Sequence, residues 1–509
     1  MKHNLNNDKH STRPKAIVVG AGAGGLSAAI ALASKGAQVT LLEKSDGPGG
    51  KIRTETIAGR PIDAGPTVFT MRWMFDELFR DAGAEVEDYL HLRKAALLAR
   101  HAWRQGGTLD LFPDIQQSAD AIEAFAGPGD AQGYRRFAAR SASIFETLRN
   151  PFMKEQKPSK LDVVRRVGLF GMPSFVINIR PMITLWRELH RYFSDPRLIQ
   201  LFGRYATYVG SSPFQTPATI MLIAHAEREG VWSVDGGMAA VAQALASLAV
   251  KKGVTIEYGA NVESINVSNG KVAGVTTEQH GSYTADLVIF NGDKSALGHG
   301  MLGNEVKTAS TVTKRPKRSL SAVTACLVGK TSGFDLAHHS VFFDDDYRSE
   351  FDAVFQDRRL PEKPTVYVCA QDRAEGALGV QEASGAPPER IFLLTNAPAD
   401  GDEVSIDTNA AFSRATGLMS ACGLDLQFAP ENLVLTGPQD FNDRFPATGG
   451  ALYGETSHGM TGTLDRAGTA TNIQGLFLAG GSVHPGPGVP MAVMSGRLAA
   501  DQAILAYAS

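Results

Sequence analysis

Residues 16–25, AIVVGAGAGG, decide the fold of this 509-residue chain. Residues 16–19 form a continuous apolar run that stops at a glycine, which is typical of a short buried strand. The glycines at 20, 22 and 25 match the Gly-x-Gly-x-x-Gly pattern, in which a tight turn lets bare backbone approach a pyrophosphate. Apolar residues then recur at helical spacing as far as Lys35. The stretch therefore predicts a strand, a phosphate-binding turn and a helix whose N-terminal amides face the phosphates.

An acidic residue stands where this kind of turn needs one. Residues 38–43 are predicted to form the second strand, and Glu43 ends it 18 residues after Gly25. An acidic side chain at this place accepts hydrogen bonds from the hydroxyl groups of a ribose. A glycine-rich turn without a ligand is the alternative interpretation, and the acidic residue argues against it. The unit therefore predicts a nucleotide site of the Rossmann type.

Two further glycine motifs favour FAD over a nicotinamide cofactor. Gly49-Gly50-Lys51 follows the second strand, and residues 62–67 read IDAGPT. Such glycines let the backbone run close against a long, bent cofactor, and Lys51 is placed to neutralise a phosphate. The alternative is that DAGPT is merely a turn. Since the sequence holds no second Gly-x-Gly-x-x-Gly for NAD(P)H, we expect the electrons to leave to something other than a nicotinamide held in its own domain.

The C-terminal part of the chain carries a matching pattern. A buried strand is predicted at 475–480, a Gly/Pro-rich loop (GGSVHPGPGVPM) follows at 480–491, and an Ala-rich helix is predicted at 491–506. Pro490 suits the first position of that helix, where its missing N–H is not needed. A helix directed at the N1–C2=O edge of a flavin stabilises the negative charge of the reduced ring by roughly 0.3–2 kcal/mol. His484 is a candidate catalytic base, although a structural role in the loop is the favoured interpretation.

Composition excludes several classes of function. A net charge of −3 without a block of like charges gives no field that attracts nucleic acid. The three cysteines, Cys326, Cys369 and Cys422, are far apart and lack metal-ligand spacing, so we expect no disulfide framework, no metal site and a cytoplasmic location. No run of 18 apolar residues is present, and the polar residues 1–12 lack the apolar region of a signal peptide.

The cofactor signals fall in three separate parts of the chain. Besides the two ends, a helix is predicted at 237–252, and strands are predicted at 254–258, 262–267, 271–278 and 287–290. We therefore expect an α/β fold with a discontinuous Rossmann-like FAD-binding domain made of residues 1–95, 228–300 and 440–509. An inserted α+β domain that binds substrate and associates with the membrane is expected from residues 96–227 and 301–439.

The motifs resemble those of a known family. DAGPT, together with GLFLAGGSVHPGPGVPMAVMSGRLAA from Gly475, resembles the FAD-dependent carotenoid desaturases of the phytoene-desaturase type, within the amine oxidase superfamily. The resemblance runs over nearly the whole chain. RHAWRQGGTLDLF from Arg100, LFGRYATYVGSSPF from Leu201 and GVWSVDGGM from Gly230 are similar to the bacterial hydroxyneurosporene and methoxyneurosporene desaturases, which are 1-hydroxycarotenoid 3,4-desaturases of spheroidene and spirilloxanthin biosynthesis.

The resemblance implies a set of cofactor-binding residues. Gly481 stands where many amine oxidases have an acidic residue, which favours the carotenoid branch of the superfamily. No cysteine follows Cys422, so FAD is expected to be noncovalent. The residues expected to bind FAD are Gly20, Gly22, Ala23, Gly24, Gly25, Glu43, Lys44, Gly50, Lys51, Gly65, Pro66, Thr67, Val262, Gly480, Gly481, Val489, Pro490 and Met491.

The resemblance also implies an activity. It is hydride transfer from an allylic C–H bond to the flavin, with proton loss from the adjacent carbon, so that the flavin is the catalytic group and no protein base is identified beyond the weak candidate His484. The expected partners are a hydrophobic carotenoid, a membrane surface that the protein contacts peripherally, and oxygen or a quinone as electron acceptor. Alternatives are a phytoene desaturase, a carotene isomerase, or a non-catalytic isoprenoid-binding protein like the GDP-dissociation inhibitors.

One stretch of the middle segment leaves two interpretations open. Apolar and aromatic residues recur at helical spacing across 185–208, with a break at Asp195-Pro196. Core packing is the favoured explanation of such a stripe. The alternative is the wall of a substrate tunnel or a surface that faces the membrane.

Overall fold

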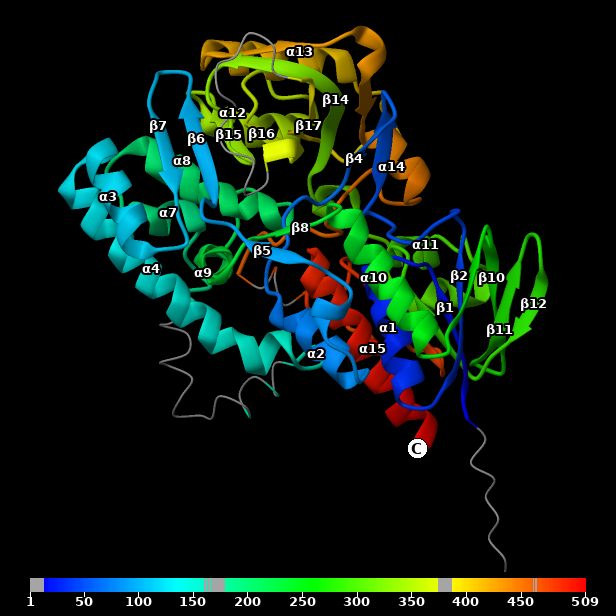
Figure 1. The fold of residues 1–509 in the computed structure, drawn as a ribbon. Helices are drawn as coiled ribbons and strands as arrows, with labels where there is room; N and C mark the ends of the chain where they lie inside the picture. The colour runs from blue at the N-terminus through cyan, green and yellow to red at the C-terminus, as the bar shows by residue number, and fades with distance from the viewer. Residues whose placement is uncertain are drawn as a thin grey trace, which may run out of the picture.

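The computed structural model describes residues 13–159, 162, 165, 179–373, 387–460, 462 and 465–509. The expectation about residues 1–12 therefore lies outside the described residues. Figure 1 shows a parallel sheet with its helices at one end of the molecule and a larger sheet, covered by α13 (Thr408–Ala421), at the other. None of the helices within these ranges is both long and apolar enough to cross a bilayer.

A five-stranded parallel sheet unites the three parts of the chain that carry the cofactor signals. Its strands lie in the order β20-β13-β1-β2-β9, and every neighbouring pair is parallel. Four of them confirm strands predicted from the sequence, and the fifth, β20, is shorter than predicted. The strands are β20 (Leu476–Leu478), β13 (Leu287–Phe290), β1 (Lys15–Val19), β2 (Gln38–Glu43) and β9 (Thr255–Tyr258).

The two faces of this sheet are buried by different partners. Val18 of β1 packs on the helical side, whereas its neighbours Ile17 and Val19 pack on the opposite side, because side chains alternate along a strand. The helices of the first side are α1 (Ala23–Ser34), α2 (Trp73–Asp81), α10 (Met238–Lys251) and α15 (Val489–Ala508). The other side is covered by an antiparallel sheet of β10 (Val262–Ser268), β11 (Lys271–Thr277) and β12 (Gly281–Thr284).

Two helix starts differ slightly from the expectation. α1 begins at Ala23, two residues before Gly25, because the backbone already turns helical inside the glycine motif. α15 begins at Val489, so Pro490 occupies its second position rather than its first. The second position also lacks an intrahelical partner for its N–H, so proline is equally tolerated there.

The larger sheet joins the two intervening segments of the chain. Its strands lie in the order β18-β14-β17-β16-β15-β6-β7, with β19 paired to β14, and β6 and β15 form a parallel pair that links the segments. The strands are β6 (Ala99–Trp103), β7 (Thr108–Leu111), β14 (Ser321–Gly333), β15 (His339–Phe343), β16 (Val366–Ala370), β17 (Glu389–Ala397), β18 (Leu424–Gln427) and β19 (Leu433–Thr436). The boundaries of the two expected domains remain a prediction.

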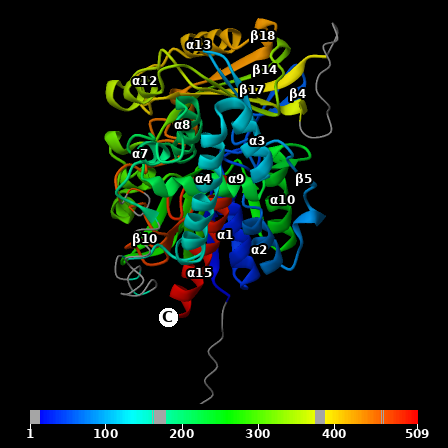
Figure 2. The same ribbon diagram turned by 90° about the vertical axis from the view of Figure 1, so that its left-hand side faces the viewer.

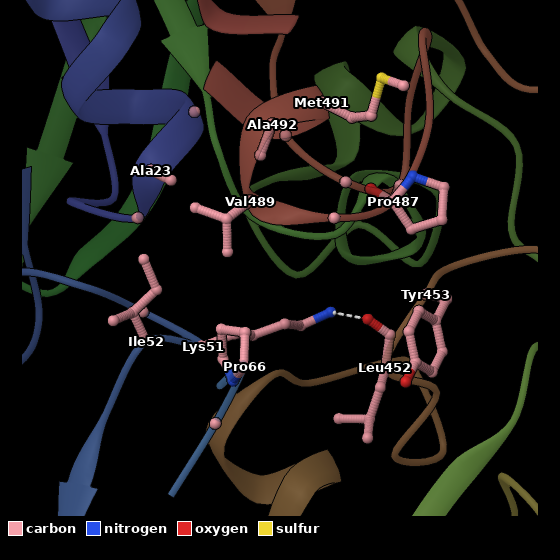
Figure 3. A pocket seen from close by; sticks show the side chains of 18 of the residues that line it. Ala23, Lys51, Ile52, Pro66, Leu452, Tyr453, Pro487, Val489, Met491 and Ala492 are labelled. Carbon is pink, nitrogen blue, oxygen red and sulfur yellow. Dashed lines mark hydrogen bonds between the residues drawn. The ribbon is translucent and has the colours of Figure 1, made fainter. Parts of the chain in front are cut away.

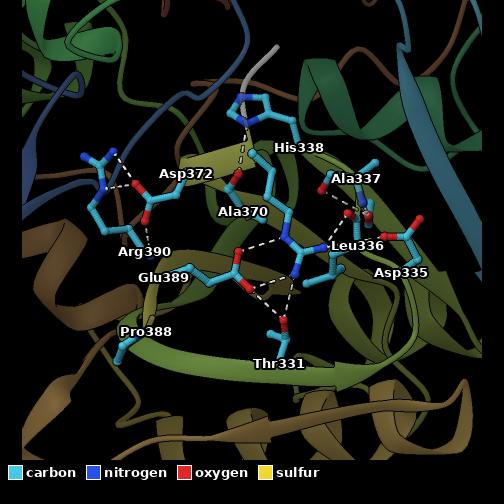
Figure 4. Close-up of polar contacts among 12 residues, drawn as sticks. Thr331, Asp335, Leu336, Ala337, His338, Ala370, Asp372, Pro388, Glu389 and Arg390 are labelled. Atoms are coloured by element: carbon cyan, nitrogen blue, oxygen red, sulfur yellow. Dashed lines mark hydrogen bonds and ion pairs between the residues drawn. The ribbon is translucent and has the colours of Figure 1, made fainter. Parts of the chain in front are cut away.

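A network of charged side chains fastens neighbouring strands of the larger sheet. The guanidinium of Arg373 donates to both carboxylate oxygens of Glu389 over 2.8 Å, and the Thr331 hydroxyl on β14 donates to the same carboxylate over 2.6 Å. Arg390 pairs with Asp372 beside it. Figure 4 shows Arg390 beside Asp372, and Thr331 beside Glu389. Since Arg373 and Glu389 are largely buried, this network stiffens the junction between β14 and β17.

A helical layer flanks the larger sheet and contains the apolar stripe of residues 185–208. Leu185, Leu189, Phe193 and Phe202 are buried in one core cluster, which confirms core packing as the explanation of most of the stripe. Figure 2 shows this layer from the side. Its helices are α3 (Ile115–Ala126), α4 (Pro128–Leu148), α7 (Leu185–Leu189), α8 (Pro196–Gly203) and α9 (Leu222–Glu229).

Candidate active site

A single cavity of about 1630 Å³ runs between the parallel sheet and the larger sheet. Every residue that the sequence analysis assigned to the cofactor lines it, except Gly25. Ordinary ligand pockets hold about 300–1,000 Å³. The volume therefore suits two molecules, a cofactor at one end and a second ligand at the other.

The nucleotide end of the cavity is walled by bare backbone. A Cβ at Gly22 would lie 2.8 Å from Oδ1 of Asn291, and one at Gly24 would lie 2.7 Å from its Nδ2. A Cβ at Gly25 would lie only 1.9 Å from the carbonyl oxygen of Gly20. Gly25 thus lets α1 pack against the turn, while Gly22 and Gly24 leave room for the Asn291 side chain.

Asn291 is a site residue that the sequence analysis missed. It follows β13, its backbone N–H donates to the carbonyl of Val19 over 2.9 Å, and its Nδ2 donates to the carbonyl of Ala479 over 3.0 Å. A Cβ at Gly480 would lie 2.7 Å from the same Nδ2. The side chain therefore holds the N-terminal and C-terminal turns together. Asn291 could have been identified from the sequence as a polar residue at the carboxyl end of a predicted buried strand.

The carboxylate of Glu43 anchors the first turn. Oε2 accepts a hydrogen bond from the backbone N–H of Ala21 over 2.6 Å, and Oε1 accepts one from Ser45 over 2.9 Å. The side chain is buried and lines the cavity. Each carboxylate oxygen has a second lone pair, so the group can still accept bonds from ribose hydroxyls.

The second glycine motif packs directly on the first. Gly49 donates its N–H to the carbonyl of Ala21 over 2.9 Å, and a Cβ at Gly65 would lie 2.0 Å from the carbonyl oxygen of Lys51. Asp63 of the DAGPT motif accepts from the N–H of Met238 over 2.6 Å and so caps α10. These contacts explain why small residues recur in both motifs.

Lys51 spans the cavity. Its Nζ donates to the carbonyl of Leu452 over 2.6 Å, and Figure 3 shows the side chain lying between Pro66 and Val489. Burial lowers the pKa of Lys51 below its ordinary value. The role of Lys51 beside a phosphate remains a prediction.

Two helices direct their N-termini into the cavity. Gly22 and Gly24 at the start of α1, and Val489 and Met491 at the start of α15, line it; the α15 residues appear in Figure 3. Helix N-termini carry unsatisfied N–H groups and partial positive charge. This end of the cavity is therefore favourable for anionic groups such as a pyrophosphate.

His484 lies behind the wall rather than in it. Its Nε2 is 3.0 Å from the carbonyl oxygen of Phe152 and 2.9 Å from that of Glu155, and the residue is not among those that line the cavity. These contacts favour the structural interpretation of His484.

Arg466 is a second residue that the sequence analysis missed. It lines the cavity and its guanidinium donates to the carbonyls of Tyr453 over 2.8 Å and Glu455 over 2.7 Å. Burial lowers the pKa of Arg466 to about 10. The side chain stiffens the loop that closes the cavity opposite α15.

The far end of the cavity is walled by side chains. One face of the larger sheet lines this end with polar and apolar side chains in turn. Leu394 lies in register with Thr324 on one neighbouring strand and with Tyr367 on the other. The Tyr367 hydroxyl lies 2.7 Å from Oγ1 of Thr67 and 2.7 Å from Nδ1 of His339. Apolar residues form most of the opposite wall, and they are Leu148, Phe152, Met153, Ile179, Val209, Ile220, Leu222, Ile223 and Ala226.

A polar cluster interrupts this apolar wall. Arg204, Tyr208 and Glu227 all line the cavity, and Tyr205 behind them donates to Glu227 over 2.7 Å. Arg204, Tyr205 and Tyr208 lie within residues 185–208, for which a tunnel wall was the less favoured interpretation. Their proximity to Glu227 was not predicted, because that residue comes from a separate helical segment.

Comparison with known proteins identifies relatives of the chain. The model of a family described as flavin containing amine oxidoreductase matches residues 23–504. A hydroxyneurosporene desaturase from Rubrivivax gelatinosus is 48% identical over 491 residues, which are 96% of this chain and 92% of that protein. A 1-hydroxycarotenoid 3,4-desaturase from a Flavobacterium species is 33% identical and covers 96% of this chain and 98% of its own.

Solved structures share the fold. An oxidoreductase from Methanosarcina mazei superposes with a TM-score of 0.59, at 16% identity, over 95% of this chain and 98% of its own. At that identity, the likeness concerns the fold alone. It confirms the expected architecture, a Rossmann-like domain with an inserted second sheet.

Proposed function

The chain belongs to the flavin containing amine oxidoreductase family, and from this premise we propose that it is an FAD-dependent desaturase that introduces a carbon–carbon double bond into an acyclic 1-hydroxycarotenoid. The observation that carries the proposal is the 48% identity, over nearly the whole chain, to a hydroxyneurosporene desaturase. The name of the Flavobacterium relative supports the bond between carbons 3 and 4 as the one oxidised.

The nucleotide end of the cavity fits FAD held without a covalent bond. The glycine-walled turns, the Glu43 carboxylate and the two helix N-termini are the groups that a dinucleotide requires. The free thiols of Cys326, Cys369 and Cys422 lie outside the set of residues that line the cavity, which supports noncovalent binding. When bound, the flavin supplies the acceptor for the two electrons of the desaturation.

The far end of the cavity suits a long hydrocarbon. Its apolar wall removes CH₂ groups from water, which contributes about 0.8 kcal/mol for each. The Thr67 hydroxyl lies 2.7 Å from the Tyr367 hydroxyl of the sheet wall, so Thr67 and its neighbour Pro66, which also line the cavity, would direct an allylic carbon toward the cofactor. Two hydrogens then leave adjacent carbons, one as a hydride and one as a proton. The electrons pass finally to oxygen or a quinone.

We infer that the protein collects its substrate as a peripheral protein at a membrane surface from the cytoplasm. Among the described residues, Met182 is the most exposed of the large hydrophobic side chains, at 79%, and Met460 is 53% exposed. Pro181, next to Met182, lines the cavity, as does Met460 itself. Exposed apolar surface is a feature of sites that bind membranes, proteins or ligands, and a substrate that is a long hydrocarbon favours a membrane here.

Identification of the pigment formed tests the activity. The protein is expressed in cells that accumulate phytoene, neurosporene or a 1-hydroxylated acyclic carotenoid, and the products are identified by mass and absorption spectrum. We expect two hydrogens to be lost from the hydroxylated carotenoid much faster than from its parent hydrocarbon. Turnover of phytoene would favour a phytoene desaturase, a shift of geometry without loss of hydrogen an isomerase, and a colourless protein that retains no flavin an isoprenoid-binding protein.

Sedimentation with lipid vesicles tests the membrane proposal. The purified protein should pellet with vesicles of bacterial phospholipid, and Met182→Glu should reduce the pelleted fraction several-fold. Val404→Glu is the matched control, because Val404 is also exposed, at 45%, but neither of its chain neighbours lines the cavity, whereas Pro181 beside Met182 does. Equal binding of the wild type and Met182→Glu would contradict a docking surface at this rim.

A further inference from the structure

Two opposite charges stand in the apolar wall of the substrate end. Arg204 follows α8, and Glu227 lies in α9. Both line the cavity, among apolar residues such as Ile220, Ile223 and Ala226. Burying a charge in an apolar wall is unfavourable unless hydrogen bonds compensate it. A hydrocarbon chain offers no such bonds, so the position of these charges calls for an explanation.

Hydrogen bonds connect the two charged residues through Tyr208. The hydroxyls of Tyr205 and Tyr208 both donate to the Glu227 carboxylate, the former over 2.7 Å. Nη2 of Arg204 donates to the Tyr208 hydroxyl over 3.2 Å, and the guanidinium carbon lies 5.1 Å from the centre of the Tyr208 ring. Glu227 is thus well satisfied, and Tyr208 links the two charges.

Arg204 is left with donors to spare. A guanidinium carries five N–H groups and cannot accept a hydrogen bond. Within the described part of the chain, the Tyr208 hydroxyl is the one hydrogen-bond partner of this guanidinium, and Nε is buried without any. Burial acts to lower the pKa of Arg204, but Tyr208, Glu227 and Tyr205 raise it, so the net shift is upward and the group stays charged. The cavity therefore presents a fixed cation with unused donors.

The cluster lies near the junction with the cofactor end. Tyr208 and Thr67 line the same cavity, and Thr67 is hydrogen-bonded to Tyr367. Burial raises the pKa of Tyr367, and Tyr208 and Arg204 are near enough to modify it as well. The unused donors therefore face the same cavity as the Thr67–Tyr367 pair.

The chemistry of the substrate matches this position. The name of the 33%-identical relative puts a hydroxyl on carbon 1 and the new double bond at carbon 3. Three bonds separate that oxygen from carbon 3, which is about 4 Å, as three bonds separate successive Cα atoms. A group that binds the hydroxyl must therefore adjoin the reacting carbons. An alcohol oxygen accepts two hydrogen bonds and donates one, so it can accept from Arg204 and donate toward Tyr208 or Glu227.

We propose that Arg204, positioned by Tyr208 and Glu227, binds the terminal hydroxyl oxygen of the substrate and so selects which carotenoid, and which end of it, reaches the cofactor. The proposal rests on the proposed function. It assigns the charged cluster to substrate specificity rather than to the redox step. Hydrogen bonds to a site built for an alcohol are lost with an analogue that lacks the oxygen, which is why such sites discriminate strongly.

Three substrates and four variants test the proposal. Each variant is assayed as the FAD-loaded full chain with a 1-hydroxylated acyclic carotenoid, its methyl ether and the parent hydrocarbon. Arg204→Met should lower kcat/KM about 10- to 100-fold for the two oxygenated substrates and leave the value for the hydrocarbon within about threefold. Arg204→Lys should restore part of the loss. Arg187→Met is the matched control, since Arg187 is an exposed arginine of α7 that does not line the cavity.

The fourth variant and a second measurement guard against misfolding. Tyr208→Phe keeps the ring and removes the hydroxyl that orients Arg204, and it should lower kcat/KM for the hydroxylated substrate several-fold more than for the hydrocarbon. Binding of the same three pigments, followed by the shift of their absorption bands, should lose its preference for oxygenated ends in Arg204→Met. Equal losses for all three substrates, or none, would overturn the subsite. If the wild type desaturates no carotenoid at all, the proposed function fails instead.

Discussion

The two ends of the cavity are built by opposite means. The nucleotide end is walled by backbone that glycines leave bare, and its fixed dipoles come from helix N-termini. The substrate end is walled by side chains from a sheet and from helices, with one charged cluster among apolar groups. The first arrangement tolerates almost no added atom, whereas the second can be altered one side chain at a time. Because the two ends are built separately, the substrate can change through substitutions at one end while the cofactor is retained at the other.

The largest effect is expected from a glycine-to-alanine substitution at the most crowded part of the nucleotide end, compared with the same substitution at an open position. Gly25→Ala places a Cβ 1.9 Å from the carbonyl oxygen of Gly20, so α1 must move away from the turn. We expect flavin content to fall more than about tenfold, with a lower yield of folded protein. The readout is flavin absorbance per chain after purification with excess FAD.

The matched control carries the same change in open space. Gly417→Ala lies within α13, where an added Cβ meets nothing within 4 Å. It should leave flavin content unchanged and stabilise the fold by about 0.5–1 kcal/mol, because alanine favours a helix interior. Equal flavin content in the two variants would refute the backbone-walled account of the nucleotide end.

The pH dependence of stability tests the burial of one carboxyl group near the substrate end. The Glu350 carboxyl, behind the sheet wall, is bonded to Thr365 over 2.7 Å and to Asn396 over 2.8 Å. Burial raises the pKa of Glu350 to about 7 from 4.5. The carboxyl therefore stays protonated to a higher pH in the folded protein than in the unfolded chain. The stability that Glu350 contributes in this way declines as the pH rises from about 4.5 to 7.

The decline amounts to about 3 kcal/mol, taking 1.36 kcal/mol for each pKa unit. Denaturant titrations of the wild type and Glu350→Gln across that range measure it. The free energy of unfolding of Glu350→Gln should change less over this interval than that of the wild type. Parallel curves would mean that Glu350 is ionised in the folded protein throughout.

Asn291 tests whether one side chain supports the backbone-walled end. Asn291→Ala removes the hydrogen bond to Ala479 and the amide that lies against Gly24 and Gly480. We expect the free energy of unfolding to fall by about 2 kcal/mol and FAD to dissociate faster, both measured on the same preparation. Retained stability and unchanged flavin release would show that the two turns hold each other without this residue.

The smallest effect distinguishes two tyrosines at the substrate end. Among the described residues, the buried Tyr347 hydroxyl has no hydrogen-bond partner, so Tyr347→Phe should leave the free energy of unfolding unchanged or slightly raised. Tyr205→Phe removes a bond to Glu227 and should lower it by about 1 kcal/mol. Thermal denaturation compares the two, and the reverse order would contradict the contacts described.

The sequence predicts the nucleotide end far better than the substrate end, for a physical reason. A turn that approaches a phosphate needs glycines at fixed spacing, so β1, α1 and β2 lie within two residues of their predicted positions. Asn291 meets Ala479 across a separation of 188 residues, and Tyr205 and Tyr208 meet Glu227 only because two helical segments pack together. No local pattern specifies such encounters. The assignments of FAD-binding residues and of the two domain boundaries remain predictions.

The close crossing of the first and last helices has a consequence for biosynthesis. A Cβ at Gly496 would lie 2.1 Å from the carbonyl oxygen of Gly24, so α1 and α15 are in intimate contact although nearly the whole polypeptide separates them. Until α15 has been synthesised, the N-terminal turn lacks the helix that packs on it. Domains generally fold as units, N-terminal first, but this one needs residues that lie more than 450 positions after its first turn. We therefore expect a chain that stops before Val489 to retain no flavin.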